Sequence, residues 1–333
     1  MAQDHLLLAP WKGPFGGVPP LDQVQVEHFK PALEQGMVDT LAELEQIASR
    51  AEPPTFENTL AAMERSGQPF NRAVTLFGTW SGSKSSAAFR AVEEELAPKL
   101  AAFQDRIVQN AALFARIKAV YEGKEKTKLT EEQQRLTWVV YNQFVKQGAA
   151  LDDEKKKKLS ELNQQLASLT TRFAQNQLGD EEHDALVIEK EAGLAGLPPE
   201  QVAAAAAEAE RRGLKGRWVI ANTRSSMEPF LTCADDRGLR EQAFRIWTSR
   251  GDTGNARDNN AIVAEVLRLR AQKAKLLGYE TYAHWKLSDQ MAKTPETALA
   301  LMRSVWKPAR EQFLKDVAEA EGLAGHPLQP WDY

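Results

Sequence analysis

The sequence lacks the features that mark several classes of protein. Its 333 residues include one cysteine, Cys233, so no disulfide can form within the chain and we expect a reducing, cytoplasmic location. No apolar run approaches the ~18 residues of a membrane-spanning helix, and the short run at residues 6–9 has no basic flank typical of a signal peptide. The near balance of 42 basic and 46 acidic residues argues against nucleic acid or a membrane as partner.

Histidine is also scarce, and this excludes a familiar metal motif. A zinc-peptidase helix carries His-Glu-x-x-His, in which two imidazoles four residues apart bind one ion and the glutamate activates its water. None of the five histidines begins this motif. The polar cluster at residues 181–184, which contains His183, would need an unusual loop to bind a metal, because consecutive side chains diverge around a helix. We predict no metal-binding and no catalytic residues in this chain.

Three other groups of residues have ordinary structural explanations. A lone cysteine among apolar neighbours, such as Cys233, is more often a core residue than a nucleophile. Residues 81–84 match Ser-x-x-Lys, but the companion motifs are missing and a helix junction explains the pattern. Arg224 and Glu228 lie between two predicted strands, where a turn is the usual structure and a polar cleft edge is the alternative. These two residues are our candidates for substrate contact.

The strongest positive signal is helical periodicity. Leu159, Leu162, Leu166, Leu169 and Phe173 step by three and four residues, so they line one face of a long helix. Further stripes are Leu96, Leu100, Phe103 and Ile107, continued by Phe114 and Ile117; Val263, Val266, Leu267, Leu276 and Leu277; and Leu301, Val305, Trp306, Phe313 and Val317. We expect all of these stripes to pack in the core.

Strand signals are confined to one region. Residues 186–188 and 218–220 are short β-prone runs and residues 230–232 are a weaker third, which predicts a small sheet of two or three strands near residues 186–232. Prolines at positions 53–54, 198–199 and 295 mark helix starts, and residues 10–20 form an irregular arm. Loops are expected near residues 123–126 and 179–184. The chain is therefore predicted to be mainly α.

Several segments, in consistent order, resemble the zinc metallopeptidases of the thimet oligopeptidase family, most closely its peptidyl-dipeptidase (dipeptidyl carboxypeptidase) branch. The resemblance covers essentially the whole chain. Its most specific part is Leu-Leu-Gly-Tyr at 276–279, Ala-His-Trp at 283–285 and Asp-Gln-Met-Ala-Lys-Thr-Pro-Glu at 289–296. Other matching segments lie at residues 19–22, 28–32, 54–59, 64–67, 215–220, 239–241, 258–260 and 330–333.

The resemblance implies the N-terminal half of a two-lobed, channel-containing, zincin-type peptidase. Residues 1–150 would form a helical arm and cover of the channel, and residues 151–333 would hold a long helix, the small β element and the first part of the peptidase domain. Family members are about twice this length, and their zinc ligands lie in the half that is missing here. Zinc would thus belong to the intact enzyme and not to this chain.

The implied partners are short peptide substrates and the missing C-terminal half. The intact enzyme would release C-terminal dipeptides, while this chain alone would be inactive. We also expect the isolated chain to expose apolar surface, with Trp331 and Tyr333 near its edge. Two alternatives stay open. One is an endo-acting oligopeptidase, and the other is a catalytically inactive helical binding or regulatory protein derived from the peptidase's N-terminal half.

Overall fold

The computed structural model describes residues 6–124 and 128–333. Helices hold 70% of the chain, and within the described residues the one sheet has two strands, β1 (Ala185–Ile188) and β2 (Trp218–Ala221). The prediction of a mainly α protein with a small sheet is confirmed. The chain forms two compact units, which are described separately: unit 1 holds residues 1–171 and 268–285, and unit 2 holds residues 172–267 and 286–333.

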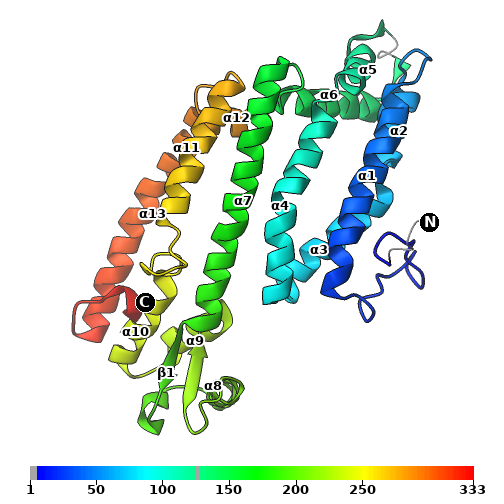
Figure 1. The fold of residues 1–333 in the computed structure, drawn as a ribbon. Helices are drawn as coiled ribbons and strands as arrows, with labels where there is room; N and C mark the ends of the chain where they lie inside the picture. The colour runs from blue at the N-terminus through cyan, green and yellow to red at the C-terminus, as the bar shows by residue number, and fades with distance from the viewer. Residues whose placement is uncertain (1–5, 125–127) are drawn as a thin grey trace. The chain divides into compact units, whose positions relative to one another are not determined.

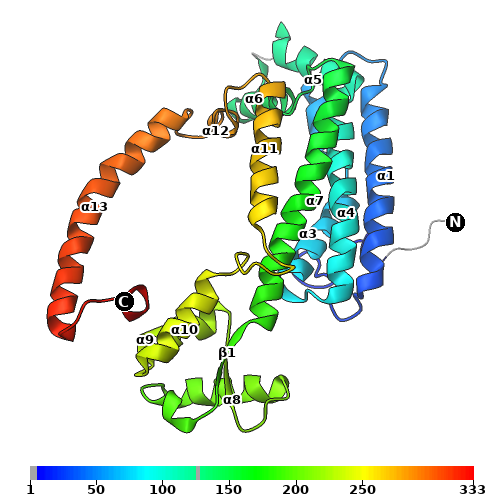
Figure 2. The ribbon, with the colours of Figure 1, turned by 60° about the vertical axis from the view of Figure 1, so that its left-hand side comes forward.

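Unit 1 is a set of packed helices in which α1 contacts α3, α4 and α5; Figures 1 and 2 show α1 beside α4. Its helices are α1 (Phe29–Ala48), α2 (Ala62–Arg65), α3 (Gln68–Ser83), α4 (Ala87–Val108), α5 (Ala111–Glu122), α6 (Glu131–Lys146) and α12 (Tyr282–Leu287), with the 3₁₀ turn η1 (Val26–His28) and the π-helical turn η2 (Phe56–Ala61). It shares α7 (Asp153–His183) and α11 (Asn260–Leu276) with unit 2, which also takes the last residues of α12.

The core of unit 1 contains a cluster of aromatic rings. Phe29 is fully buried, and the rings of Phe77, Trp80 and Phe89 meet it edge-on at centroid distances of 5.3–5.6 Å. Edge-to-face pairs of this kind stabilise a core beyond the apolar area that they bury. These contacts join α1, α3 and α4 into one body.

The stripe predicted to run on through Phe114 is interrupted, so that prediction is wrong. Helix α4 ends at Val108 and a new helix begins at Ala111. The side chain of Asn110 accepts a hydrogen bond from the backbone N–H of Leu113 at 2.9 Å. An asparagine in this position satisfies an otherwise unpaired N–H and so begins a helix.

The leucine-striped helix is α7, as predicted. Leu159 and Leu162 are buried, whereas Leu166, Leu169 and Phe173 are half-buried. The helix continues to His183, so the loop predicted near residues 179–184 is wrong for most of its length. The loop predicted near residues 123–126 begins where α5 ends, and residues 125–126 lie outside the described residues.

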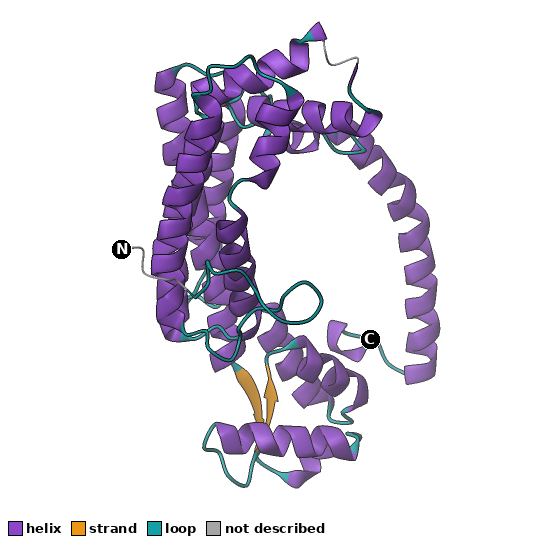
Figure 3. Cartoon of the chain, turned by 90° about the vertical axis from the view of Figure 1, so that its right-hand side faces the viewer, coloured by secondary structure: helices purple, strands orange, loops and turns teal. Residues whose placement is uncertain are grey.

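Unit 2 contains the antiparallel pair β1–β2, with Leu186 opposite Ile220. Helix α8 (Pro199–Arg211) lies against β2, as Figure 3 shows. The remaining elements are η4 (Glu191–Leu194), α9 (Arg224–Cys233), α10 (Arg237–Thr248), α13 (Pro295–Ala324) and η5 (Pro330–Asp332). The weak third strand at residues 230–232 is wrong, because Met227 and Phe230, three residues apart, are buried on one face of α9.

Two predicted stripes lie on helices but not in the core. On α11, Val263 and Leu267 are exposed, whereas Ile262 and Leu269 are buried. Helix α13 begins as predicted, with the Thr294 side chain accepting from the N–H of Thr297, but its large apolar side chains face solvent. The exposed fractions are 69% for Leu301, 58% for Val305, 68% for Trp306 and 54% for Phe313. The expectation that these stripes pack in the core is wrong for α13 and for these α11 residues.

Candidate functional site

The two candidate substrate contacts, Arg224 and Glu228, lie on the first turns of α9 and not in a turn between strands. The Arg224 Nε atom is 2.9 Å from a Glu228 carboxylate oxygen, and the side chains are 81% and 49% exposed. This ion pair raises the pKa of the Arg224 guanidinium. An i,i+4 pair on an exposed helix face is a common surface feature. It supplies charge for binding, and neither residue is a nucleophile paired with a base.

The acidic cluster at the end of α7 is paired with arginines. Asp180 is fully buried, its Oδ2 atom accepts from the N–H of Gly251 at 2.7 Å, and its Oδ1 atom pairs with Arg257. Glu181 pairs with Arg250, and Asp184 lies 3.5 Å from Arg257. Guanidinium groups therefore occupy the positions that a cation would take. Within residues 6–124 and 128–333, no three His, Cys, Asp or Glu side chains are grouped closely enough to hold a metal ion.

The serine and lysine of the Ser-x-x-Lys match have separate partners. The Ser81 hydroxyl donates to the carboxylate of Glu93. The Lys84 ammonium group lies over the Trp80 ring, 4.7 Å from its centroid. The lysine is thus not placed as a base for the serine, because its ammonium is held against an aromatic face. Cys233 is a half-buried free thiol at the last residue of α9.

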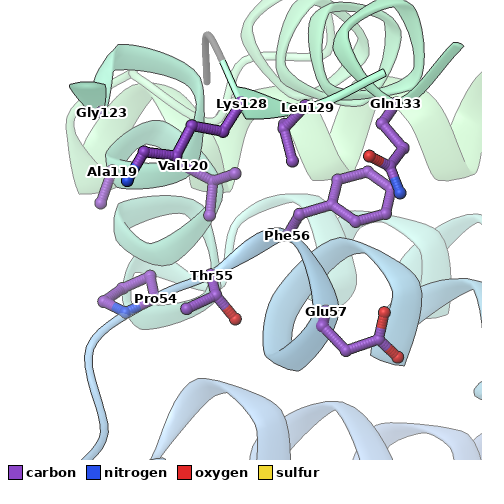
Figure 4. Close-up of a pocket in the computed structure, with 10 residues that line it drawn as sticks. All are labelled: Pro54, Thr55, Phe56, Glu57, Ala119, Val120, Gly123, Lys128, Leu129 and Gln133. Atoms are coloured by element: carbon purple, nitrogen blue, oxygen red, sulfur yellow. The ribbon is translucent and has the colours of Figure 1, made fainter. Parts of the chain in front are cut away.

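A pocket of about 400 Å³ lies in unit 1, between the start of η2 and the segments around α5 and α6. Figure 4 shows the Phe56 ring facing Leu129, with Lys128 reaching toward Ala119. Pro54 and Val120 extend the apolar wall, and the polar lining residues are Thr55, Glu57, Lys128 and Gln133. The pocket can enclose an apolar group flanked by a polar one. From the sequence, its first residues were predicted to begin a helix and matched the family resemblance, but they were not predicted to line a pocket.

Buried Arg116 fixes the wall of this pocket. Its guanidinium donates to the carbonyl oxygens of Arg50 at 3.0 Å and Glu52 at 3.1 Å, and to the Asn58 side chain at 2.9 Å. Asn58 also caps the turn, by accepting from the N–H of Thr55. A planar guanidinium can hold several acceptors at once. The extended segment before η2 is therefore held from the inside of the unit.

Two family matches cover most of the chain. Residues 32–156 match the family described as "Neurolysin/Thimet oligopeptidase, N-terminal domain". Residues 230–333 match "Peptidase family M3". The two matches occur in the order that the resemblance in the sequence implies. The chain belongs to the M3 peptidase family.

Individual relatives of this M3 chain agree with that assignment. A protein of Salmonella typhimurium named "Dipeptidyl carboxypeptidase" is 35% identical over 320 residues, which cover 95% of this chain and 47% of the relative. "Probable cytosolic oligopeptidase A" of Arabidopsis thaliana is 30% identical, with 94% of this chain and 46% of the relative covered. "Oligopeptidase A" of Salmonella typhimurium is 28% identical, with coverage of 95% and 48%. The chain spans about half the length of the curated relatives that it matches.

In the described part of this M3 chain, no helix has the length and apolarity needed to cross a bilayer. Arg224 and Glu228, the candidate substrate contacts named from the sequence, form an ion pair with each other. The pocket in Figure 4 lies in unit 1, whereas both of these residues belong to unit 2. The M3 chain therefore presents two separate candidate binding features, and neither contains a catalytic constellation.

Proposed function

We propose that this chain is the N-terminal portion of a cytoplasmic, zinc-dependent oligopeptidase that releases C-terminal dipeptides from short peptides. Support for the dipeptide-releasing branch comes from the identities, since the relative named for that activity is 35% identical and the one named oligopeptidase A from the same organism is 28% identical. Support for a partial chain comes from coverage, because 95% of this chain accounts for only 47% of the first relative.

In this proposal the chain contributes a wall of the substrate channel and none of the reacting groups. Residues 1–150 form the cover, and residues 151–333 form the first part of the peptidase domain. The described residues do not fit a zinc site, since no group of three possible ligands is close together among them and a catalytic zinc needs three protein ligands. The metal and the groups that act with it would come from sequence outside this chain.

The exposed face of α13 is the observation that supports this proposal best. The helix has 30 residues, none of them buried, and Met302, Trp306 and Phe313 are each more than half exposed. It lies inside the segment that matches the M3 peptidase family. Three large apolar side chains on one exposed helix indicate an interaction surface. We propose that the complementary part of the peptidase covers this surface.

Sequencing the reading frame past codon 333 is the first test. A continuing frame that encodes a His-Glu-x-x-His helix supports the proposal, and the downstream polypeptide can then be co-expressed with this chain. We expect a soluble complex that releases dipeptides from blocked oligopeptides in a zinc-dependent manner, while neither part alone does so. Copurification without hydrolysis of several peptides would contradict the enzyme proposal.

Two alternatives give different results in the same experiments. A stop codon at position 334 of the native gene, with a chain that is monomeric and stable alone, favours an inactive helical binding protein; its ligand site would then be sought first in the pocket of Figure 4, which has an apolar wall and a polar rim. An endo-acting oligopeptidase would cleave inside the blocked peptides and leave products longer than dipeptides. Mass analysis of the products separates these outcomes.

A further inference from the structure

Three helices of unit 1 meet at a buried carboxylate. Asp105 on α4 is 6% exposed, and its Oδ1 atom accepts from the side-chain amide of Asn163 on α7 at 2.6 Å. The amide oxygen of Asn163 in turn accepts from the Lys273 ammonium of α11 at 2.7 Å. The Oδ2 atom of Asp105 has no hydrogen-bond partner among the described residues. The asparagine amide is therefore polarised between a carboxylate and an ammonium group.

The same lysine holds Trp285 of α12. The Lys273 ammonium lies 4.8 Å from the centroid of the Trp285 ring, and the Lys146 ammonium of α6 lies 5.4 Å from it. The indole N–H of Trp285 donates to the backbone oxygen of Lys146 at 2.9 Å. Cation–π contacts and this hydrogen bond fix α12 to the end of α6. A continuous set of contacts thus runs from Asp105 to Trp285.

We propose that Asp105, Asn163, Lys273 and Trp285 form a proton-sensitive latch that holds α12 within unit 1. With Asp105 ionised, its charge orients the Asn163 amide, and this amide oxygen fixes Lys273 over the indole. With Asp105 protonated, on the free Oδ2 atom, the attraction for the lysine is lost and the ammonium leaves the ring more readily. This latch does not depend on the peptidase function proposed above.

The groups around Asp105 determine the pH range over which the latch responds. Burial raises the pKa of the Asp105 carboxyl, and Asn163, Ser160 and Lys273 oppose that rise. Lys273 is the charged group that faces it from α11, and α7 contributes the uncharged Asn163 and Ser160. Just past the end of α4, the Lys156 ammonium of α7 approaches the backbone oxygen of Gln109 at 3.4 Å. Because burial holds the pKa of Asp105 above its ordinary value, the carboxyl takes up its proton at a higher pH than an exposed aspartate does.

Linkage predicts two opposite effects of pH. The pKa of Asp105 is higher in the folded than in the unfolded chain. Its contribution to the free energy of unfolding therefore decreases as the pH rises through the range in which the carboxyl loses its proton. Release of α12 removes the indole face that holds the Lys273 ammonium beside Asn163. The lysine side chain can then turn toward water and the pKa of Asp105 rises further, so docking of α12 becomes stronger over the same pH range. A general effect of acid on stability would move both quantities in one direction.

Hydrogen exchange of residues 279–287 in the 333-residue chain tests the latch. After correction for intrinsic exchange rates, we expect α12 to open of the order of fivefold less often at pH 7 than at pH 4. Asp105→Asn resembles the protonated carboxyl, so this variant should open as often at pH 7 as the wild type does at pH 4. Asp39→Asn, a matched change at an exposed residue of α1, should keep the wild-type pH dependence.

Lys273→Met provides a second route if Asp105→Asn fails to fold. This variant loses the ammonium but keeps a long side chain, and we expect frequent opening of α12 at both pH values. The proposal is overturned if wild-type α12 protection does not change between pH 4 and pH 7. It is also overturned if Lys273→Met retains the wild-type pH dependence, or if a folded Asp105→Asn protects α12 fully at pH 7.

Discussion

The carboxylate of Asp332 is bound by the guanidinium group of Arg240, with Oδ1 2.9 Å from Nη2, and the Asp332 side chain is only 3% exposed. Arg237 adds a second ion pair at 2.8 Å. The ring of Trp331 packs at 6.2 Å from that of Phe244 on α10. These contacts dock η5 onto α10. Trp331 is therefore half-buried against α10, whereas Tyr333 is 59% exposed.

Replacing Asp332 should weaken this docking. Asp332→Asn removes the charge that two arginines share, and we expect a loss of about 1–3 kcal/mol in the free energy of unfolding. Hydrogen bonds from Arg237 hold the pKa of Asp332 well below its usual range, so the contribution is complete at neutral pH and is lost as pH falls below about 4. Urea denaturation at pH 7 and pH 3 measures both effects. The exposed Asp316→Asn on α13 is the control and should change little.

Glu208 on α8 provides an independent source of acid sensitivity. Hydrogen bonds from Arg211 and Arg212 lower the pKa of Glu208 from 4.5 to about 2. Its stabilising contribution is therefore present above pH 4.5 and is lost between pH 4.5 and pH 2. Because the site is partly exposed and Arg211 faces water, Glu208→Gln should cost no more than about 1 kcal/mol at pH 7. Equal stability losses at pH 7 and pH 2 would contradict this assignment.

The leucines of α7 should differ in cost according to their burial. Leu159 is 1% exposed, so Leu159→Ala should lower the free energy of unfolding by ~2–5 kcal/mol. Leu166 is half-buried, and its replacement by alanine should cost roughly half as much, since less apolar area is lost. Chemical denaturation of both variants gives the comparison. If Leu166→Ala proved the more costly of the two, the burial pattern of α7 described here would be wrong.

Helix starts could be predicted from the sequence because their causes are local. Thr294 begins α13 through its own side chain and Pro295 follows it, so a few residues carry the information. The buried face of α11 could not be predicted in this way. Ile262 and Val263 are both apolar, and only the surrounding helices decide that the first is buried and the second is exposed.

The candidate sites were harder to predict than the helices, because most of them are formed by residues far apart in the sequence. Arg224 and Glu228 could be paired from their spacing alone once they lay on a helix. The pocket in Figure 4 could not be predicted, since it joins residues 54–57 to residues 119–133. The network of Asp105, Asn163 and Lys273 likewise comes from three helices far apart in the sequence. Nothing in the local pattern around Asp105 marks it as buried.

Arg116 should be essential for holding the segment that precedes η2 in its folded position. Arg116→Met leaves the carbonyl oxygens of Arg50 and Glu52 without this donor, while Asn58 keeps the N–H of Thr55. Each buried acceptor left unpaired costs about 1–3 kcal/mol. We expect a large loss of stability and faster proteolysis within residues 50–58. Arg65→Met is the control, because Arg65 pairs with Glu57 on an exposed surface. If Arg116→Met were cleaved no faster than the wild type, the hydrogen bonds of Arg116 would not be what holds the segment before η2 in place.

The exposed face of α13 should determine whether this chain associates with itself and with the downstream polypeptide. Trp306 and Phe313 lie close together around the helix, and Trp306→Glu with Phe313→Glu places two charges on the surface that we propose the rest of the peptidase covers. We expect less self-association and less binding of an apolar dye, with little change in the free energy of unfolding because both side chains are more than half exposed. In co-expression with the downstream polypeptide, the double variant should fail to form a complex.

Leu301→Glu is the matched control for that experiment. Leu301 is 69% exposed on the same helix, but at about 100° per residue it lies roughly 120–140° away from Trp306 and Phe313. Leu301→Glu therefore introduces a charge on the same helix but on a different face, and this variant should still form a complex with the downstream polypeptide. If Leu301→Glu disrupted the complex as strongly as the double variant, association would depend on the general apolarity of α13 and not on one face. If the double variant associated normally, α13 would not be the surface that joins the two parts.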